Sequence, residues 1–171
     1  MSQNHSYFIQ VAAACILSFT ALTGCSSFSS NKGLTKDERA LVGEWLFTDN
    51  DICQFYKMRH ADKTFKEYCF QVMDDYTGTA ITTTVTGTWR LRGKTYCETY
   101  TSVGYDKWQS FVGRPISYRC SRTAATLEYL FQDSMPVLER KISPSEAGVL
   151  AAHPFAFITA GARKKYHIEG H

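Results

Sequence analysis

The chain has 171 residues, with 19 basic and 16 acidic side chains and a formal net charge of +3. A charge this small, carried by basic residues dispersed along the chain, excludes a nucleic-acid-binding protein that works through a strongly basic surface. Aromatic residues make up 14% of the chain, which favours strands, and the length beyond an N-terminal leader suits one domain with its own core.

The N-terminal segment, residues 1–24, predicts a cleaved lipoprotein signal peptide. Its apolar part, residues 11–22, is too short for a membrane-spanning helix, which needs about 20 apolar residues. Leu22-Thr23-Gly24, at the end of this segment, and the following Cys25 resemble the lipobox of bacterial lipoproteins. The resemblance implies cleavage before Cys25 and a lipid on its thiol. An ordinary secretory cleavage site and an uncut N-terminal anchor are the alternatives.

The residues after Cys25 indicate where the lipid-anchored protein resides. Residues 25–34 are polar and serine-rich, as in a flexible tether. Ser26 follows the lipid-bearing cysteine, and the resemblance to lipoproteins then implies the outer membrane of the cell envelope. The membrane is thus an expected partner through the lipid, and residues 35–171 are expected to form one domain.

Four of the six cysteines remain after removal of Cys15 and lipidation of Cys25. An even number of cysteines in an oxidising envelope predicts two disulfides. A metal site is the alternative, but no Cys-x-x-Cys pair or ligand-like histidine spacing supports it. The four are Cys53, Cys69, Cys97 and Cys120.

The first elements after the tether are a short helix, a strand and a hairpin. Thr35 and Glu38 form a capping box that predicts a helix from about Lys36 to Leu41, and a strand begins at Gly43. Strands at about 52–59 and 63–72 then flank a turn at residues 60–62.

The register of this hairpin predicts both a disulfide and a shared apolar face. With the turn as centre, Cys53 lies opposite Cys69, so we expect Cys53–Cys69 and, from the remaining cysteines, Cys97–Cys120. The alternation of side chains places six apolar residues on the other face. They are Ile52, Tyr56, Met58, Tyr68, Phe70 and Val72.

A long strand at 79–91 follows, bent or bulged at Gly87, with Trp89 on its apolar face. Further strands are expected at 95–103, at 108–120 with an interruption at 113–115, and in a last hairpin at 125–131 and 137–142. A second capping box, Ser143 to Glu146, predicts a short helix to about Ala152. The pattern of residues 153–171 does not place them.

The order of these elements predicts the fold class. Strands follow one another through short turns, and no helix of crossover length separates them, so the sheet is an antiparallel meander. About eight strands with one apolar face are expected to close into an all-β barrel or half-barrel, because closure removes exposed strand edges.

Two Gly-x-Trp segments carry a resemblance to a known family. Leu41-Val42-Gly43-Glu44-Trp45 opens the first strand, a similar segment runs over residues 87–93, and a late strand covers 126–130. Their order and spacing over roughly residues 41–142 resemble the lipocalin-like domains of bacterial envelope proteins. The resemblance implies an up-and-down β-barrel and does not imply a particular ligand.

Aromatic side chains are the candidate binding residues, either as the core or as the lining of a ligand cavity. Small barrels are usually filled by their own side chains, which favours the core. No nucleophile motif such as Gly-x-Ser-x-Gly is present, and we expect no catalytic residue, metal or cofactor. The candidates are Tyr56, Tyr68, Phe70, Trp89 and Tyr118.

The sequence therefore predicts a non-enzymatic binding or interaction module anchored to the outer membrane. An envelope protein is one expected partner. The alternative is a carrier or sensor of a small hydrophobic ligand held in the barrel. An open apolar cavity of about 300 Å³ or more would favour the carrier, whereas a filled barrel with an exposed aromatic patch would favour protein binding.

Overall fold

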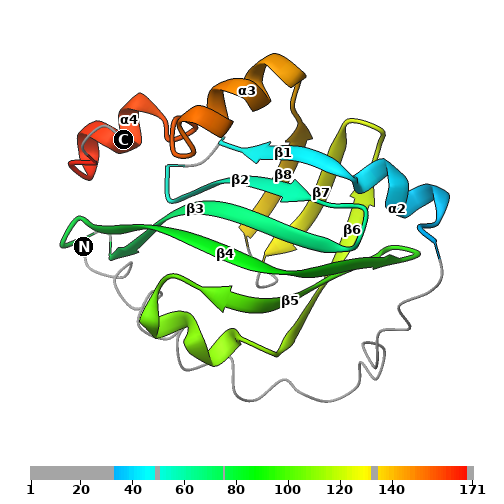
Figure 1. Ribbon diagram of the computed structural model, residues 1–171. Helices are drawn as coiled ribbons and strands as arrows, with labels where there is room; N and C mark the ends of the chain where they lie inside the picture. Colours follow the sequence, from blue (N-terminus) through cyan, green and yellow to red (C-terminus); the bar gives the residue numbers. More distant parts are fainter. Residues whose placement is uncertain (1–32, 49–50, 75, 132–134, 169–171) are drawn as a thin grey trace. The chain divides into compact units, whose positions relative to one another are not determined.

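The computed structural model describes residues 33–48, 51–74, 76–131 and 135–168 (Figure 1). The predicted signal peptide, Cys25 and most of the tether lie outside these residues. Within them, no helix is long and apolar enough to cross a membrane.

Eight antiparallel strands form a closed barrel in which each strand pairs with the next, and the last pairs with the first. This confirms the all-β up-and-down meander and its closure. The strands are β1 (Gly43–Phe47), β2 (Cys53–Arg59), β3 (Thr64–Asp74), β4 (Thr79–Arg92), β5 (Thr95–Val103), β6 (Pro115–Arg122), β7 (Thr126–Phe131) and β8 (Met135–Lys141).

The glycine of the second Gly-x-Trp segment lies where the barrel wall bends. The pairing of β4 with β5 shifts between Thr86 and Gly87, which confirms the predicted bulge. A Cβ atom on Gly87 would lie 2.4 Å from the carbonyl oxygen of Thr99 and 2.6 Å from the ring of Phe65. Only glycine fits at this close approach.

One end of the barrel is closed by α2 (Lys36–Leu41), whose bounds agree with the prediction. Thr35 and Glu38 form the predicted capping box, in which each side chain accepts a hydrogen bond from the other's backbone N–H. Glu38 also pairs with Lys63 in the β2–β3 turn at 2.7 Å. The indole of Trp45 donates to the carbonyl oxygen of Leu41 at 2.9 Å, so α2 is fixed to the barrel wall.

The C-terminal segment packs on the outside of the barrel, against β1, β2 and β3 (Figure 1). It contains α3 (Pro144–Ala152), as predicted, and α4 (Ala160–Lys165). The side-chain amide of Gln54 bonds both the backbone N–H and the hydroxyl of Thr159, which caps α4. The apolar side chains buried between this segment and the barrel are Leu46, Tyr56, Phe70, Val72, Leu150, Phe157, Ile158, Ala162 and Tyr166.

The predicted register of the first hairpin is wrong by two residues. Cys53 pairs with Gln71, and Cys69 pairs with Phe55. The hairpin turn extends to Thr64, and Lys63 adopts a positive φ of 67°. A shift of two keeps the faces unchanged, so the predicted grouping of side chains by face is retained.

The strand predicted at residues 108–120 is wrong in its first part. Asp106–Phe111 forms a 3₁₀ helix, η1, with Trp108 N–H donating to the carbonyl oxygen of Tyr105 at 2.9 Å. Gly113 then takes a positive φ of 77°, and β6 begins only at Pro115. This turn carries the chain across the end of the barrel opposite α2.

Candidate functional site

The inside of the barrel holds a buried lysine among three glutamates. Lys57 Nζ lies 2.5 Å from an oxygen of Glu98, 2.8 Å from Glu67 and 3.9 Å from Glu139. Lys57 is only 2% exposed. These residues occupy inward positions on β2, β3, β5 and β8, so their charges meet because the sheet closes into a barrel.

A second cation, Arg59, lies one inward position further along β2. It forms a two-bond ion pair with Glu139, at 2.6 and 2.8 Å, and both side chains are fully buried. The hydroxyl of Tyr96 accepts from Arg59 Nε at 2.8 Å, and the hydroxyl of Tyr129 donates to Glu139 at 2.9 Å. The guanidinium also lies 5.5 Å from the ring of Trp45. The charges of Arg59 and Glu139 thus neutralise each other at the α2 end of the barrel interior.

Burial and neighbouring charges act differently on the ionisable groups of this cluster. Burial lowers the pKa of Lys57, but Glu67, Glu98 and Glu139 raise it by more, so the ammonium is retained. Burial raises the pKa of Glu139, but Arg59 and Lys57 lower it by more. Burial also raises the pKa of Glu67, and Lys57 offsets this only in part, so the pKa stays above its ordinary value of 4.5.

Glu67 and Glu139 are therefore expected to affect stability with opposite pH dependence. A raised folded-state pKa means that the stability contributed by Glu67 falls as pH rises above 4.5. Glu67→Gln should hence gain stability relative to the unsubstituted protein as pH rises from about 4 to about 8. Glu139→Gln should lose relative stability over the same range, because its folded-state pKa is lowered.

Urea unfolding of both variants at the two pH values measures whether relative stability changes in these opposite directions. A loss of relative stability in Glu67→Gln at the higher pH would contradict the raised pKa of Glu67.

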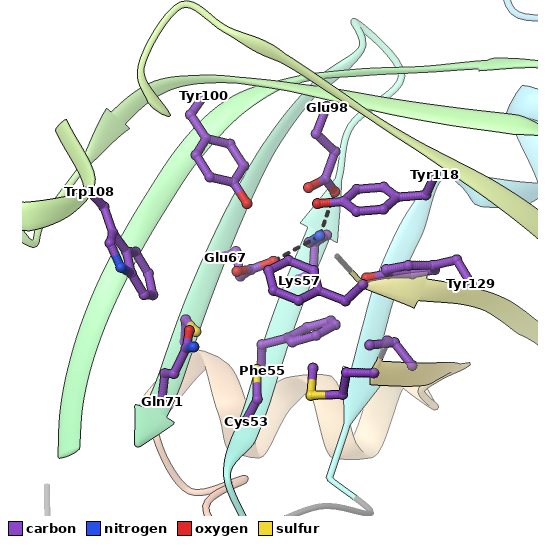
Figure 2. A pocket seen from close by; sticks show the side chains of 14 residues that line it. Cys53, Phe55, Lys57, Glu67, Gln71, Glu98, Tyr100, Trp108, Tyr118 and Tyr129 are labelled. Carbon is purple, nitrogen blue, oxygen red and sulfur yellow. Dashed lines mark hydrogen bonds and ion pairs between the residues drawn. The ribbon is translucent and has the colours of Figure 1, made fainter. Parts of the chain in front are cut away.

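A cavity of about 40 Å³ lies beside the cluster, at the end of the barrel covered by η1. It has room for about three water molecules, since one water needs about 10–15 Å³. Figure 2 shows Tyr100 and Tyr118 directed into it from different sides, near Glu67 and Glu98. The other walls of the cavity include Cys53, Phe55, Gln71, Trp108, Phe131 and Met135.

Several hydrogen-bonding atoms at this cavity are not used by the protein. Among the described residues, Lys57 bonds one oxygen of Glu67, and Lys57 and Tyr96 bond one oxygen of Glu98. The second oxygen of each carboxylate forms no hydrogen bond there, nor do the hydroxyls of Tyr100 and Tyr118. Tyr118 is nevertheless only 5% exposed. Among the described residues only the Thr83 hydroxyl is fully buried without a hydrogen-bond partner, so these oxygens are accessible from the cavity. Polar atoms without a protein partner usually bind water or a ligand.

The structure divides the five predicted candidate residues between two faces. Trp89 and Tyr118 point into the barrel core, and only Tyr118 lines the cavity. Tyr56, Tyr68 and Phe70 lie outside, against the C-terminal segment, so they do not line the barrel cavity. The alternation of side chains along β2 and β3 separates the two groups.

Sequence reasoning missed the charged residues of the interior. No sequence motif marks Lys57, Glu67 and Glu98 as interior residues. Where charged and apolar residues alternate along a strand, the charged side ordinarily faces solvent. The inward position of Trp89 could have identified two of them, because Glu98 pairs with Trp89 and Glu67 pairs with its inward neighbour Val85.

The four cysteines of the domain are buried, and no disulfide joins them in the described residues. Cys53 and Cys69 lie on the inward face at neighbouring pairs, and the hydrogen bond that the Cys69 thiol shares with Cys53, together with burial, raises the pKa of Cys69. Cys97 pairs with Ser117 on the outward face, whereas Cys120 belongs to the barrel core. The strand register therefore favours a disulfide between Cys53 and Cys69 and does not favour one between Cys97 and Cys120.

Under oxidising conditions we therefore expect a Cys53–Cys69 bond and no Cys97–Cys120 bond. Thiols on opposite faces of one sheet cannot approach without movement of the backbone. Peptide mapping without reduction should recover Cys53 linked to Cys69. Recovery of Cys97 linked to Cys120 from the folded protein would show that the β5–β6 register is different.

Comparisons with known proteins find similarity in solved structures only. No family model matches the chain, and no curated protein matches it. A lipocalin-like protein from Bacteroides uniformis aligns over 60% of this chain and 99% of its own, with 14% identity and a TM-score of 0.40. An uncharacterized protein from Bacteroides eggerthii aligns over 59% and 98%, with 13% identity and a TM-score of 0.37. Alignments at this level carry no functional argument.

Proposed function

We propose that this protein is a non-enzymatic binding module, anchored to the outer membrane through Cys25, that binds a small polar molecule in its barrel. The observation that supports this proposal is the cavity lined by Glu67, Glu98, Tyr100 and Tyr118, where carboxylate and hydroxyl oxygens lack a protein hydrogen-bond partner among the described residues. A few polar groups converging in a pocket with aromatic walls is the usual arrangement of a small-molecule site.

The same cavity argues against a carrier of a hydrophobic molecule. Its volume of about 40 Å³ is well below the roughly 300–1,000 Å³ of pockets that enclose drug-sized ligands. An acyl chain entering further would displace Lys57 from its carboxylates and leave buried charges unpaired, at several kcal/mol each.

Ligand titration followed by tryptophan fluorescence tests the proposed site, because Trp108 lies at the cavity wall. We expect small polar amines, amides or alcohols to change the emission saturably, and an apolar probe such as a fatty acid to leave it unchanged. Tyr118→Phe should weaken polar binding about fivefold, the effect of one hydrogen bond of about 1 kcal/mol. Tyr166→Phe, in the outer cluster, is the matched control. Saturable binding of the fatty acid alone would contradict the proposal.

A second candidate function, protein binding, is favoured by the outer face of β7 and β8. Leu130 is 51% exposed and Leu138 is 46% exposed on this face, which the C-terminal segment does not cover. Apolar side chains exposed together are typical of an interaction surface. If an envelope protein binds here, Leu138→Glu should abolish its cross-linking, whereas Tyr118→Phe should not affect it.

The lipid anchor is tested separately from the barrel. Cys25→Ala removes the thiol that would carry the lipid, so the precursor should stay unlipidated and should not float with membranes. Cys15→Ala, inside the same N-terminal segment, should be processed normally. Normal mass and membrane fractionation of Cys25→Ala would refute the lipobox interpretation.

A further inference from the structure

We infer that the barrel cavity binds the ammonium group of a small primary amine. This inference rests on the proposed function and specifies the chemical class of its ligand. Three features of the described residues carry it: the balance of buried charges, the kind of hydrogen-bonding atoms that face the cavity, and the aromatic walls.

The buried charges of the interior do not balance. Arg59 and Glu139 form a mutual pair, so Lys57 is left to serve both Glu67 and Glu98. One carboxylate charge therefore remains at the cavity without its own cation. A buried charge of this kind is unfavourable unless a proton or a cation compensates it.

The other titratable groups around this carboxylate do not compensate the charge. Burial raises the pKa of the hydroxyls of Tyr100 and Tyr118, so both stay neutral. Burial and Cys53 likewise raise the pKa of Cys69. Glu98 and Glu139 add negative charge around Glu67, and the nearest cation, Lys57, is shared with Glu98.

The unused atoms at the cavity match the donors of an ammonium group. They comprise the second oxygens of Glu67 and Glu98 and the hydroxyls of Tyr100 and Tyr118, which come from β3, β5 and β6. Carboxylate oxygens are acceptors only, and hydroxyls can accept. A primary ammonium has three donors and no acceptor. Tyr118, which is 5% exposed, points to a bound partner independently of the acidic residues.

The aromatic walls also favour a cation. Lys57 Nζ already lies 5.0 Å from the ring of Phe55 and 5.3 Å from the ring of Phe65. Phe55, Trp108 and Phe131 line the cavity, and aromatic rings attract cations. An anionic ligand would instead approach two carboxylates. No group of three metal-ligating side chains is placed to hold a metal ion in the part of the chain that the structure describes.

Calorimetric titration of the full-length protein with ethylammonium, ethanol and potassium chloride tests the ligand class. Ethylammonium should bind saturably, and ethanol, which is of similar size but neutral, should bind at least tenfold more weakly. Potassium should not compete.

Variants of the cavity identify the groups responsible. Glu67→Gln should weaken ethylammonium binding at least tenfold, whereas Glu128→Gln, on the exposed outer side of β7, should leave it unchanged. If Glu67→Gln does not fold, Tyr118→Phe provides the second variant. It should weaken ethylammonium binding about fivefold, through the loss of one hydrogen bond of about 1 kcal/mol.

The outcomes separate this inference from the proposed function. Ethanol binding as tightly as ethylammonium, or an unchanged affinity in Glu67→Gln, would overturn the ammonium assignment and leave a polar site in place. Potassium binding in competition would assign a metal cation instead. If no polar probe binds at all, both the inference and the proposed function are wrong.

Discussion

Replacing Arg59 by leucine is expected to destabilise the protein by about 3–5 kcal/mol, the range for removing one partner of a buried ion pair. Glu139 is 0% exposed and would be left without the cation that it contacts at 2.6 and 2.8 Å. Net stability of a domain of this size is about 5–15 kcal/mol. Urea unfolding of the variant should therefore show a much lower midpoint.

The control for Arg59 is an arginine in an exposed pair. Arg140 contacts Glu146 at 2.7 Å, but the side chains are 48% and 41% exposed. Arg140→Leu should change stability by less than about 1 kcal/mol, because exposed pairs contribute little. The double variant Arg59→Leu/Glu139→Leu should be more stable than Arg59→Leu alone, since it does not leave Glu139 without its cation. Similar small losses at Arg59 and Arg140 would mean that the Arg59–Glu139 pair is not buried.

Trp89→Ala is expected to destabilise the protein by about 3–5 kcal/mol, the range for truncating a large buried aromatic side chain. Trp89 is 1% exposed and belongs to the barrel core. Its indole N–H also lies 3.1 Å from the carbonyl oxygen of Thr64 and 3.3 Å from that of His60. The variant loses apolar packing and the hydrogen bonds that join β4 to the β2–β3 turn. Urea unfolding measures the resulting loss of stability.

The neighbouring Arg90 is the control for this position. It lies on the outward face of β4 and pairs with Cys97, so Arg90→Ala should cost no more than about 1 kcal/mol. Equal effects at Trp89 and Arg90 would mean that β4 does not have one buried and one outward face.

The course of the strands could be predicted because local patterns determine it. The capping boxes at Thr35 and Ser143 define helix starts, and the alternation around Trp89 defines an inward face. The bulge at Gly87 followed from the presence of glycine within a strand. The error at residues 108–111 arose because aromatic residues favour strands. The chain instead forms the 3₁₀ helix η1 there, before it enters β6.

Apart from what the inward position of Trp89 indicates, the interior of the barrel could not be predicted, because β2 and β3 have two buried faces. Tyr56 and Phe70 lie on the more apolar face, which pattern analysis takes to be the core, yet the C-terminal segment covers that face from outside. The other face holds Lys57 and Glu67. The partners Glu98 and Glu139 come from distant strands, so only closure of the barrel brings these charges together.

A crystal structure of the protein purified from the cells that produce it tests the central claim most directly, because it shows what occupies the barrel. The expected result is Lys57 between Glu67 and Glu98, with density for a small polar group within hydrogen-bond distance of Tyr118 and a carboxylate. An extended acyl chain inside the barrel, with Lys57 displaced towards solvent, would contradict the proposed small polar site.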